Sequence, residues 1–189
     1  MKLTTIALAS IISVGTLFAG TYNVDLDHSN VAFKVRHMMI SNVTGQFNKF
    51  SGTFEYDDHS KTLRALNGEV DVSSIDTDNV KRDDHLKSVD FFDVAKYPSM
   101  QLTLEKIEGD TATMKLTMHG VTKEVKMVLE TSGVVIKDPW GNSRTGLSLS
   151  GKINRKDFGL NWNQLIETGG VAVGETIKIS LEIEGILTK

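Results

Sequence analysis

Alternation of apolar and polar residues dominates the chain and predicts β-strands. Phe33, Val35 and His37 fall on one face of a predicted strand, and Lys34 and Arg36 fall on the other. Successive side chains of a strand point to opposite faces of the sheet. The row that begins with Phe33 is therefore expected to face a core, and the row with Lys34 is expected to face solvent.

The same period-two pattern recurs along the chain, with few interruptions. Gly109-Asp110 and His119-Gly120 separate pairs of alternating segments and predict tight hairpin turns. About eight antiparallel strands follow from this count. Gly45 and Gly52 interrupt one long segment and are expected to form bulges or bends, which let a sheet curl. Such curling favours a closed barrel, although the pattern alone leaves a sandwich open.

One stretch departs from the alternation and predicts a helical insertion over residues 76–95. Asp76, Thr77 and Asp78 have short side-chain oxygens that can accept hydrogen bonds from the free N–H groups of a helix start. About three turns follow without glycine or proline. Tyr97-Pro98 ends the stretch, because the residue before proline is pushed out of the helical region.

The insertion carries two adjacent aromatic residues, Phe91 and Phe92. Two neighbouring exposed phenylalanines would be an unusual surface patch, so at least one ring is expected to face the apolar interior. Two interpretations remain open at this point. The insertion is either a plug or lid over a β-barrel, or a solvated helix that only connects strands.

Several motifs together resemble the YceI-like family. They are Ser74-Ile75-Asp76-Thr77, Arg82-Asp83, His85-Leu86-Lys87-Ser88, Asp90-Phe91-Phe92-Asp93, Lys96-Tyr97-Pro98, His28-Ser29, Phe33-Lys34-Val35-Arg36-His37-Met38, the Gly120 to Lys123 turn and Asp157-Phe158-Gly159. The resemblance covers almost the whole chain after residue 20. It implies a secreted bacterial protein with an all-β, lipocalin-like, eight-stranded barrel that binds polyisoprenoids or related lipids.

The N-terminus is typical of a secretory signal peptide. Lys2 supplies a positive charge, residues 3–18 are mostly apolar, and small residues precede a polar change at Thr21. We expect a signal peptide over residues 1–20, a single barrel domain over residues 21–189, and a periplasmic location. No second apolar run of spanning length follows, so stable membrane insertion is not expected.

Composition excludes several classes of function. The chain has no cysteine, which excludes disulfides, thiol nucleophiles and thiolate metal sites. The formal net charge of −3 argues against nucleic-acid binding, which favours a basic patch. The acidic residues near Asp76 lack the order of a calcium loop. Neither a catalytic motif nor a metal-ligand spacing stands out, so we expect no enzymatic activity, metal or cofactor.

The histidines offer the main alternatives to a purely apolar core. His59 and His119 lie in predicted turns and are expected to be solvated. His85 lies in the insertion, either in an ion-pair and capping network or as a ligand for a polar head group. His37 shares the apolar face, where it is either a satisfied core residue or a polar group inside a lipid cavity.

Several methionines lie on the apolar faces of the predicted strands. Their flexible, polarisable side chains suit a cavity wall that must fit a long lipid tail of variable shape. Ordinary core filling remains the alternative. The candidate ligand-binding residues are Phe33, Val35, His37, Phe47, Phe92, Leu104, Met114, Leu116, Met118 and Met127.

The function expected from the resemblance is a carrier that sequesters a long-chain isoprenoid or acyl lipid: a polyisoprenoid, an isoprenoid quinone or a fatty-acyl amide. A homodimer is left open. Two other classes stay open as well. One is an enzyme that modifies an isoprenoid with His37 as acid or base, and the other is a stress or adhesion protein with a filled barrel.

Overall fold

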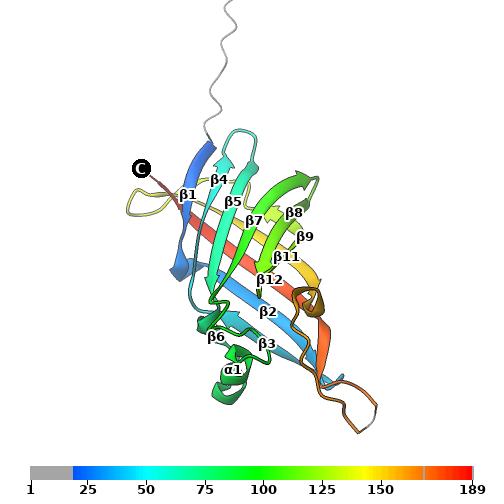
Figure 1. Cartoon of the computed structure of the whole chain (residues 1–189). Helices are drawn as coiled ribbons and strands as arrows, with labels where there is room; N and C mark the ends of the chain where they lie inside the picture. The colour runs from blue at the N-terminus through cyan, green and yellow to red at the C-terminus, as the bar shows by residue number, and fades with distance from the viewer. Residues whose placement is uncertain (1–18, 168, 189) are drawn as a thin grey trace, which may run out of the picture.

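The computed structural model describes residues 19–167 and 169–188 and shows a barrel of antiparallel strands (Figure 1). The strands are β1 (Ala19–Val24), β2 (Asn30–His37), β3 (Ser41–Phe47), β4 (Phe50–Asp57), β5 (Thr62–Asp71), β6 (Ile75–Asp76), β7 (Ser99–Glu108), β8 (Thr111–Met118), β9 (Val121–Thr131), β10 (Ile136–Lys137), β11 (Ser143–Asn154) and β12 (Val173–Leu187). The helical elements are η1 (Leu26–His28), η2 (Val72–Ser74), α1 (Val80–Lys87) and η3 (Arg155–Phe158).

Eight strands close the barrel, in the order β11-β9-β8-β7-β5-β4-β1-β12. The pairing of β11 with β12, from Arg144 opposite Ile186 to Asn154 opposite Thr176, completes the ring. This closure confirms the predicted eight-stranded antiparallel barrel and excludes a sandwich for the described chain. Each strand of this ring has a neighbour on both sides, whereas the outer side of β3 pairs with β6 only at Gln46 and Phe47.

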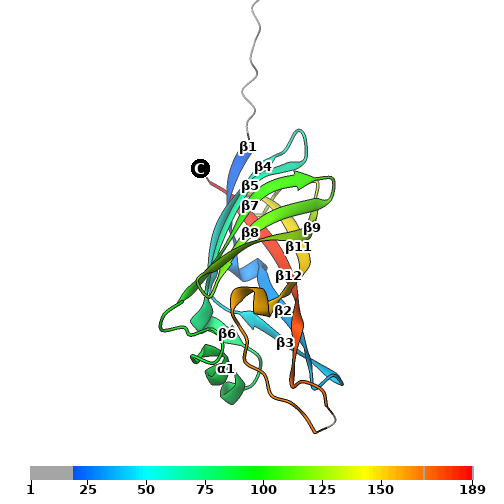
Figure 2. The same ribbon diagram turned by 45° about the vertical axis from the view of Figure 1, so that its right-hand side comes forward.

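Strands β1 and β2 lie in series along β12, with the short turn η1 between them. β1 pairs with the end of β12 near Leu187, and β2 pairs with its beginning, as far as Val173. Strands β3 and β4 continue in series on the other side, so that β1 pairs with β4 and β2 pairs with β3. β2 and β3 therefore extend the barrel wall at the end that carries α1 (Figures 1 and 2).

The predicted hairpin turns are confirmed by their backbone angles. Gly109 has φ +65°, and the turn joins β7 to β8. His119 and Gly120 have φ +52° and +74°, and they join β8 to β9. Positive φ at both central residues, as in His119-Gly120, and positive φ at the first central residue, as in Gly109-Asp110, are typical of the two-residue hairpin turns that match the twist of the flanking strands.

The predicted bends at Gly45 and Gly52 are misplaced. The long segment breaks between Phe47 and Phe50, and the β4–β5 register shifts between Glu55 and Tyr56, opposite the extra residue Arg64 of β5. The glycines instead permit close approach of neighbouring atoms. A Cβ atom on Gly45 would lie 2.5 Å from Cζ of Phe33, closer than ordinary packing allows.

The predicted helix is shorter than residues 76–95. α1 begins after Asn79, whose side chain accepts a hydrogen bond from the Arg82 N–H, and it ends at Lys87. Asp76 belongs to strand β6, and Asp78 has φ +60°, so neither caps the helix. Within residues 19–167 and 169–188, no helix has the length and apolar character needed to cross a membrane.

The residues that follow α1 form turns instead of continuing the helix. The N–H of Phe92 donates to the carbonyl of Leu86, and the N–H of Val94 donates to that of Lys87. These bonds fold the chain back under α1. The stretch of residues 77–98, which comprises α1 and these turns, is called the α1 segment below.

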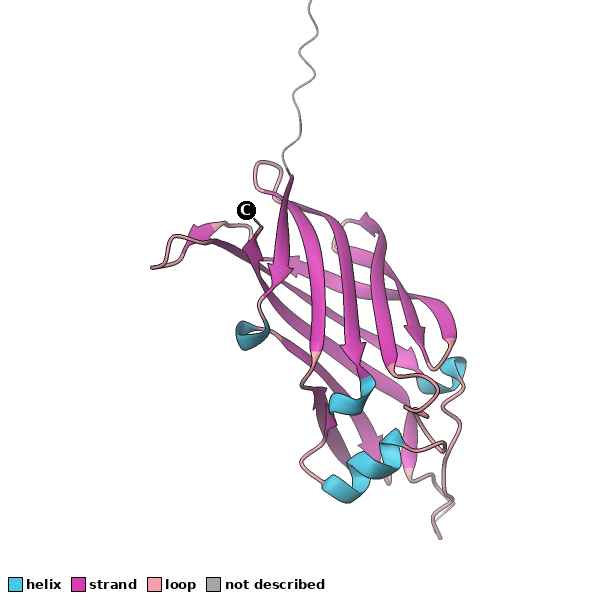
Figure 3. Cartoon of the chain, turned by 60° about the vertical axis from the view of Figure 1, so that its left-hand side comes forward, coloured by secondary structure: helices cyan, strands magenta, loops and turns pink. Residues whose placement is uncertain are grey.

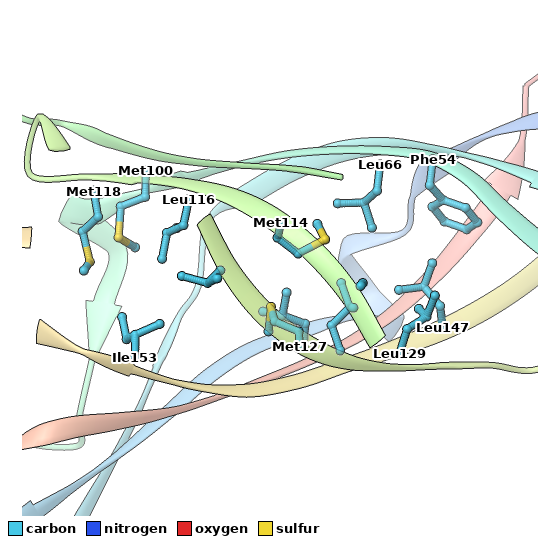
Figure 4. Packing of buried hydrophobic residues seen from close by; sticks show 14 of the residues in the cluster. Phe54, Leu66, Met100, Met114, Leu116, Met118, Met127, Leu129, Leu147 and Ile153 are labelled. Carbon is cyan, nitrogen blue, oxygen red and sulfur yellow. The ribbon is translucent and has the colours of Figure 1, made fainter. Parts of the chain in front are cut away.

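The core is continuous but unevenly filled. At the end of the barrel that holds both described termini, Tyr22 stacks on Phe54 with ring centres 5.3 Å apart, and Leu149 is fully buried. Figure 4 shows the buried side chains in order along the barrel, from Phe54 at one end to Met118 at the other. Packing is therefore dense around these residues.

The predicted signal peptide falls mostly outside the described residues, because 1–18 are not described. Ala19 and Gly20 form the first two positions of β1 and pair with Asp57 and Tyr56. A cut before Thr21 would leave the remaining β1–β4 pairs in place.

Candidate functional site

An apolar cavity of about 190 Å³ lies inside the barrel, toward the end that carries the α1 segment. The eight strands of the ring and the extending strands β2 and β3 all contribute to its wall, and the α1 segment contributes Leu86, Phe91 and Phe92. Figure 3 shows α1 at this end, opposite the end of the barrel that carries the C label. The site is thus enclosed by strands and covered by a segment with little regular structure.

Most of the residues expected at a ligand site lie in this wall. Alternation correctly identifies their inward orientation, because the side chains of one strand face point to the same side. The members found in the wall are Phe33, Val35, Phe47, Phe92, Leu116, Met118 and Met127. The geometry brings these seven together around one cavity; that they bind a ligand stays a prediction.

Leu104 and Met114 do not line the cavity, and the expectation that they do is wrong. They pair across β7 and β8, and Met114 is completely buried. Phe54 and Leu129, two other residues of the hydrophobic core, also lie outside the cavity wall. Leu104 and Met114 face inward as predicted, but they belong to the filled part of the core.

His37 also lies outside the cavity wall. It ends β2, where it pairs with Ser41 of β3 and Val173 of β12. The register of β12 shifts between Val173 and Ile177, so the inward row of β2 does not continue into the cavity past Val35. Neither the core role nor the role as a polar group within the cavity fits this position.

Two phenylalanine rings of the α1 segment close the cavity. Phe91 is buried, and Phe92 packs edge-on against Phe47 of β3 with ring centres 6.2 Å apart. Val89, by contrast, is 79% exposed. The turn at Ser88 therefore directs both rings inward, as the apolar character of the pair predicts.

Thr77 anchors the start of the α1 segment. The Asp83 carboxylate accepts hydrogen bonds from the Thr77 N–H at 3.0 Å and from its hydroxyl at 2.5 Å. The Arg82 guanidinium donates to the Thr77 hydroxyl oxygen at 2.7 Å and to its carbonyl at 2.5 Å. Thr77 is buried, so these contacts replace the hydrogen bonds that water would otherwise provide.

His85 packs between two aromatic rings at the outer side of the α1 segment. Its ring lies edge-on to Phe91 at 5.1 Å and to Trp162 at 4.8 Å, and its Nε2 lies 3.1 Å from an Asp90 carboxylate oxygen. These contacts fit the structural alternative, and His85 does not border the cavity. Trp162 was missed by the sequence analysis, because it lies in a loop and belongs to no alternating or helical pattern.

His119 is not simply solvated, contrary to the prediction from its place in a turn. Its Nδ1 lies 3.1 Å from the Phe158 carbonyl, and its ring packs on Tyr97 with centres 4.5 Å apart. Tyr97 also covers Gly120, where a Cβ would lie 2.6 Å from the ring. The β8–β9 turn, the α1 segment and η3 therefore meet at one point beside the cavity.

Arg155 is the buried charged group of the cavity wall, and no role was predicted for it from the sequence. Arg155 is 2% exposed. The other polar residues that border the cavity are exposed: Ser51, Asn67, Glu69 and Gln101. Burial lowers the pKa of the Arg155 guanidinium from its ordinary value. A guanidinium nevertheless remains protonated at neutral pH in proteins. The site thus combines an apolar wall with one positive charge.

A group of oxygen and nitrogen ligands lies away from the cavity, at Asp25, His28 and Glu184. The Arg144 guanidinium already occupies it, with Nη1 at 2.5 Å from Asp25 and 2.6 Å from Glu184. Nε of the same side chain contacts Asp138 at 2.8 Å. The cluster is an ion-pair network that joins η1, β11 and β12. Because Arg144 already binds these carboxylates, we propose no metal site there.

Comparison with known proteins decides the family. The sequence matches the YceI-like domain over residues 22–185, which includes nearly all of the barrel. The chain belongs to the YceI-like family. A UPF0312 protein of Staphylococcus epidermidis is 36% identical over 163 residues, covering 86% of this chain and 95% of the relative.

Solved YceI-like structures share the barrel. A Campylobacter jejuni YCEI protein aligns with a TM-score of 0.68 and 32% identity over 82% of this chain and 90% of its own. A structure described as a polyisoprenoid binding domain from Saccharophagus degradans aligns with a TM-score of 0.67 and 15% identity, covering 90% of this chain and 100% of its own. The latter match shows the YceI-like fold and nothing finer.

Proposed function

We propose that this YceI-like protein is a periplasmic carrier, without enzymatic activity, that sequesters one long apolar lipid inside its barrel. The lipid classes that fit are a polyisoprenoid, an isoprenoid quinone and a fatty-acyl amide. The Saccharophagus degradans structure, described as a polyisoprenoid binding domain, supports the first class by analogy of fold.

The cavity wall is the observation that carries the proposal. Aliphatic, aromatic and methionine side chains surround the cavity, and Arg155 is the buried charged residue among them. Burial of a lipid tail against such a wall releases about 25 cal/mol for each Å² of apolar surface removed from water. Affinity therefore comes mainly from the tail.

The cavity volume sets how the tail is accommodated. A dry cavity of about 150 Å³ holds a molecule the size of benzene. At about 190 Å³, this cavity holds only part of a long tail without rearrangement. Uptake of a full tail then requires movement of flexible wall residues such as Met118, or displacement of the α1 segment, which carries Phe91 and Phe92.

The α1 segment is suited to such a displacement. Strand pairing joins the barrel strands to one another, whereas the turns after Lys87 are held by local hydrogen bonds and by the packing of Phe92 on Phe47, Phe91 on Trp162 and Tyr97 on His119. Segments with few pairing bonds open at lower free energy than core strands. We therefore assign the α1 segment as the lid.

The position of His37 and the presence of the cavity favour a carrier over the two alternative functions, an enzyme and a stress or adhesion protein. An isoprenoid-modifying enzyme with His37 as acid or base requires His37 at the cavity, but this residue lies outside the wall. A stress or adhesion protein with a filled barrel requires a packed interior, whereas space remains beneath the α1 segment.

Native mass spectrometry after mild purification tests the proposal. A carrier is expected to retain one lipid molecule, whose mass identifies its class, and to take up farnesol after delipidation. A protein that purifies without lipid and binds no farnesol would overturn the carrier function. Conversion of the retained lipid to another product would favour the enzyme instead.

A further inference from the structure

Arg155 is placed in the cavity wall by the alternation of β11. Leu147, Leu149 and Ile153 point into the barrel at alternate positions, and Arg155 continues that inward row into η3. The inward-facing row of β11 thus begins with leucines, continues with an isoleucine and ends with a guanidinium. The residue is 2% exposed and borders the same cavity as Ile153.

The partners of Arg155 are backbone carbonyls. Nε donates to the carbonyl of Gly174 at 3.0 Å, Nη2 donates to that of Val173 at 3.4 Å, and Nη1 donates to that of Leu160. None of the ion pairs within the described part of the chain includes Arg155. The nearest acidic influence, Glu175, is itself paired with Lys156 at 2.6 Å. The charge is therefore solvated by dipoles and is not neutralised by an anion.

The guanidinium also has donors to spare. It carries five N–H groups in a planar fork, and the three carbonyls engage three of them. Two N–H groups remain for another acceptor. A buried charge is costly unless it is paired and hydrogen-bonded. An anion brought to this position by a ligand would supply both the missing charge and the missing acceptors.

Anchoring of the loop before β12 does not by itself explain a charged residue here. Asn163, which is neutral, already holds Val173 from the same side of the loop. Its Nδ2 donates to the Val173 carbonyl at 2.8 Å, and its Oδ1 accepts from the Val173 N–H at 3.1 Å. Only Arg155 also reaches the carbonyls of Gly174 and Leu160. Carbonyls require hydrogen-bond donors but no positive charge, as Asn163 shows at Val173, so the charge of Arg155 calls for a further role.

We infer that Arg155 binds the anionic oxygen head group of the lipid, a carboxylate or a phosphate, while the tail lies along the wall toward Met127. A guanidinium fork matches the oxygens of both groups and binds them bidentately. The inference rests on the proposed carrier function and narrows it. It selects an acidic lipid, such as a phosphorylated polyisoprenoid or a fatty acid, over the neutral quinone and acyl amide that also fit the apolar wall.

Matched ligand pairs test this selection. Farnesyl phosphate and farnesol share an isoprenoid tail, and dodecanoate and dodecanol share an acyl tail. Affinities are measured by calorimetry for the delipidated protein, for Arg155→Gln, and for the control Lys156→Gln, which removes the exposed charge of the next residue. The wild type and the control are expected to prefer each anion over its alcohol at least tenfold.

In Arg155→Gln, both preferences are expected to fall to about one, with the farnesol affinity changed by less than about threefold. The pair with the larger preference in the wild type distinguishes a phosphate from a carboxylate. A wild-type preference near one, or an equal preference in Arg155→Gln, would overturn the inference while farnesol binding still supports a carrier. If neither farnesol nor farnesyl phosphate binds, the carrier function fails as well.

A second measurement needs no substitution and serves if Arg155→Gln does not fold. Dodecanoate labelled with ¹³C at its carboxyl carbon is titrated by NMR in complex with the wild-type protein. A head group beside the guanidinium stabilises the carboxylate form, so its pKa is expected to lie below that of free dodecanoate. An elevated pKa would place the carboxyl group in the apolar part of the cavity and would contradict the inference.

Discussion

The ring of Phe33 lies against Gly45 of the neighbouring strand, in the space that a side chain on Gly45 would occupy. The two residues are paired in the β2–β3 register, and a Cβ on Gly45 would lie 2.5 Å from Cζ of Phe33. An aromatic ring over a glycine compensates for the missing side chain and fixes the ring. Phe33 is thereby held against the cavity wall.

The first prediction concerns this pair. Gly45→Ala is expected to lower the free energy of unfolding by about 1–3 kcal/mol, because overpacking forces a neighbour to move. Gly68→Ala is the matched control, since its Cβ would meet nothing nearer than 3.8 Å. Urea unfolding measures both variants. Equal effects of the two substitutions would show that Phe33 does not depend on the space above Gly45.

The second prediction separates the cavity from the filled core. Met118 lines the cavity, whereas Met114, on the same face of β8, does not. Met118→Trp is expected to block farnesol uptake in a folded protein. Met114→Trp is expected to destabilise the barrel by about 1–3 kcal/mol through overpacking. If Met118→Trp binds farnesol as the wild type does, the tail lies elsewhere.

The third prediction tests the lid. Phe92→Ala removes the contact with Phe47 without opening the main core, so bound lipid is expected to leave faster. The loss of stability should stay below the ~3–5 kcal/mol of a fully buried phenylalanine, because Phe92 is only partly buried. Stopped-flow transfer of a fluorescent lipid to vesicles measures release.

The control for the lid is Val89→Ala, which changes an exposed side chain of the same segment. It should leave both stability and release unchanged. An unaltered release rate in Phe92→Ala, together with a loss of stability, would show that the α1 segment is only a structural connector.

The fourth prediction concerns acid stability. A hydrogen bond from Arg144 holds the pKa of Asp138 well below its usual range. Burial alone would raise the pKa of Asp25, but hydrogen bonds from Arg144 and His28 outweigh it and lower the pKa. Both carboxyls are therefore more acidic in the folded chain than in the unfolded chain, where an aspartate titrates near pH ~3.9.

The stability from these two groups is present above the unfolded pKa and is lost as the pH falls through the folded values. The Tm is expected to drop below about pH 4, and differential scanning calorimetry from pH 7 to pH 2 measures it. Asp138→Asn should lower the Tm at pH 7 and flatten its pH dependence. An unchanged dependence in that variant would assign the acid sensitivity to other carboxylates.

The fifth prediction concerns signal-peptide cleavage and cellular location. The mature protein is expected to begin near Thr21 and to appear in the periplasmic fraction, because residues 1–20 have the charge and apolar run of a signal peptide. N-terminal sequencing and cell fractionation check both points. Recovery of uncleaved protein from the cytoplasm would refute the signal peptide.

Local rules sufficed for the strands and turns. The inward position of Phe33 and the hairpin at His119-Gly120 depend on side-chain alternation and on backbone angles within a few residues. The helix bounds were less accurate. Asp76 and Asp78 are good caps in isolation, but strand pairing of β6 and the contacts of Thr77 move the helix start to Val80.

The cavity, by contrast, depends on distance along the barrel, which alternation does not contain. Met114 and Met118 occupy equivalent positions on one face of β8, and only barrel closure puts one in the dense core and the other at the cavity. Arg155 and Trp162 come together with the wall through the closing of β11 on β12. The sequence by itself determined which side chains face inward, because orientation is a property of each strand. The tertiary structure decided where the cavity lies and that Arg155 borders it, because both depend on contacts between strands far apart in the chain.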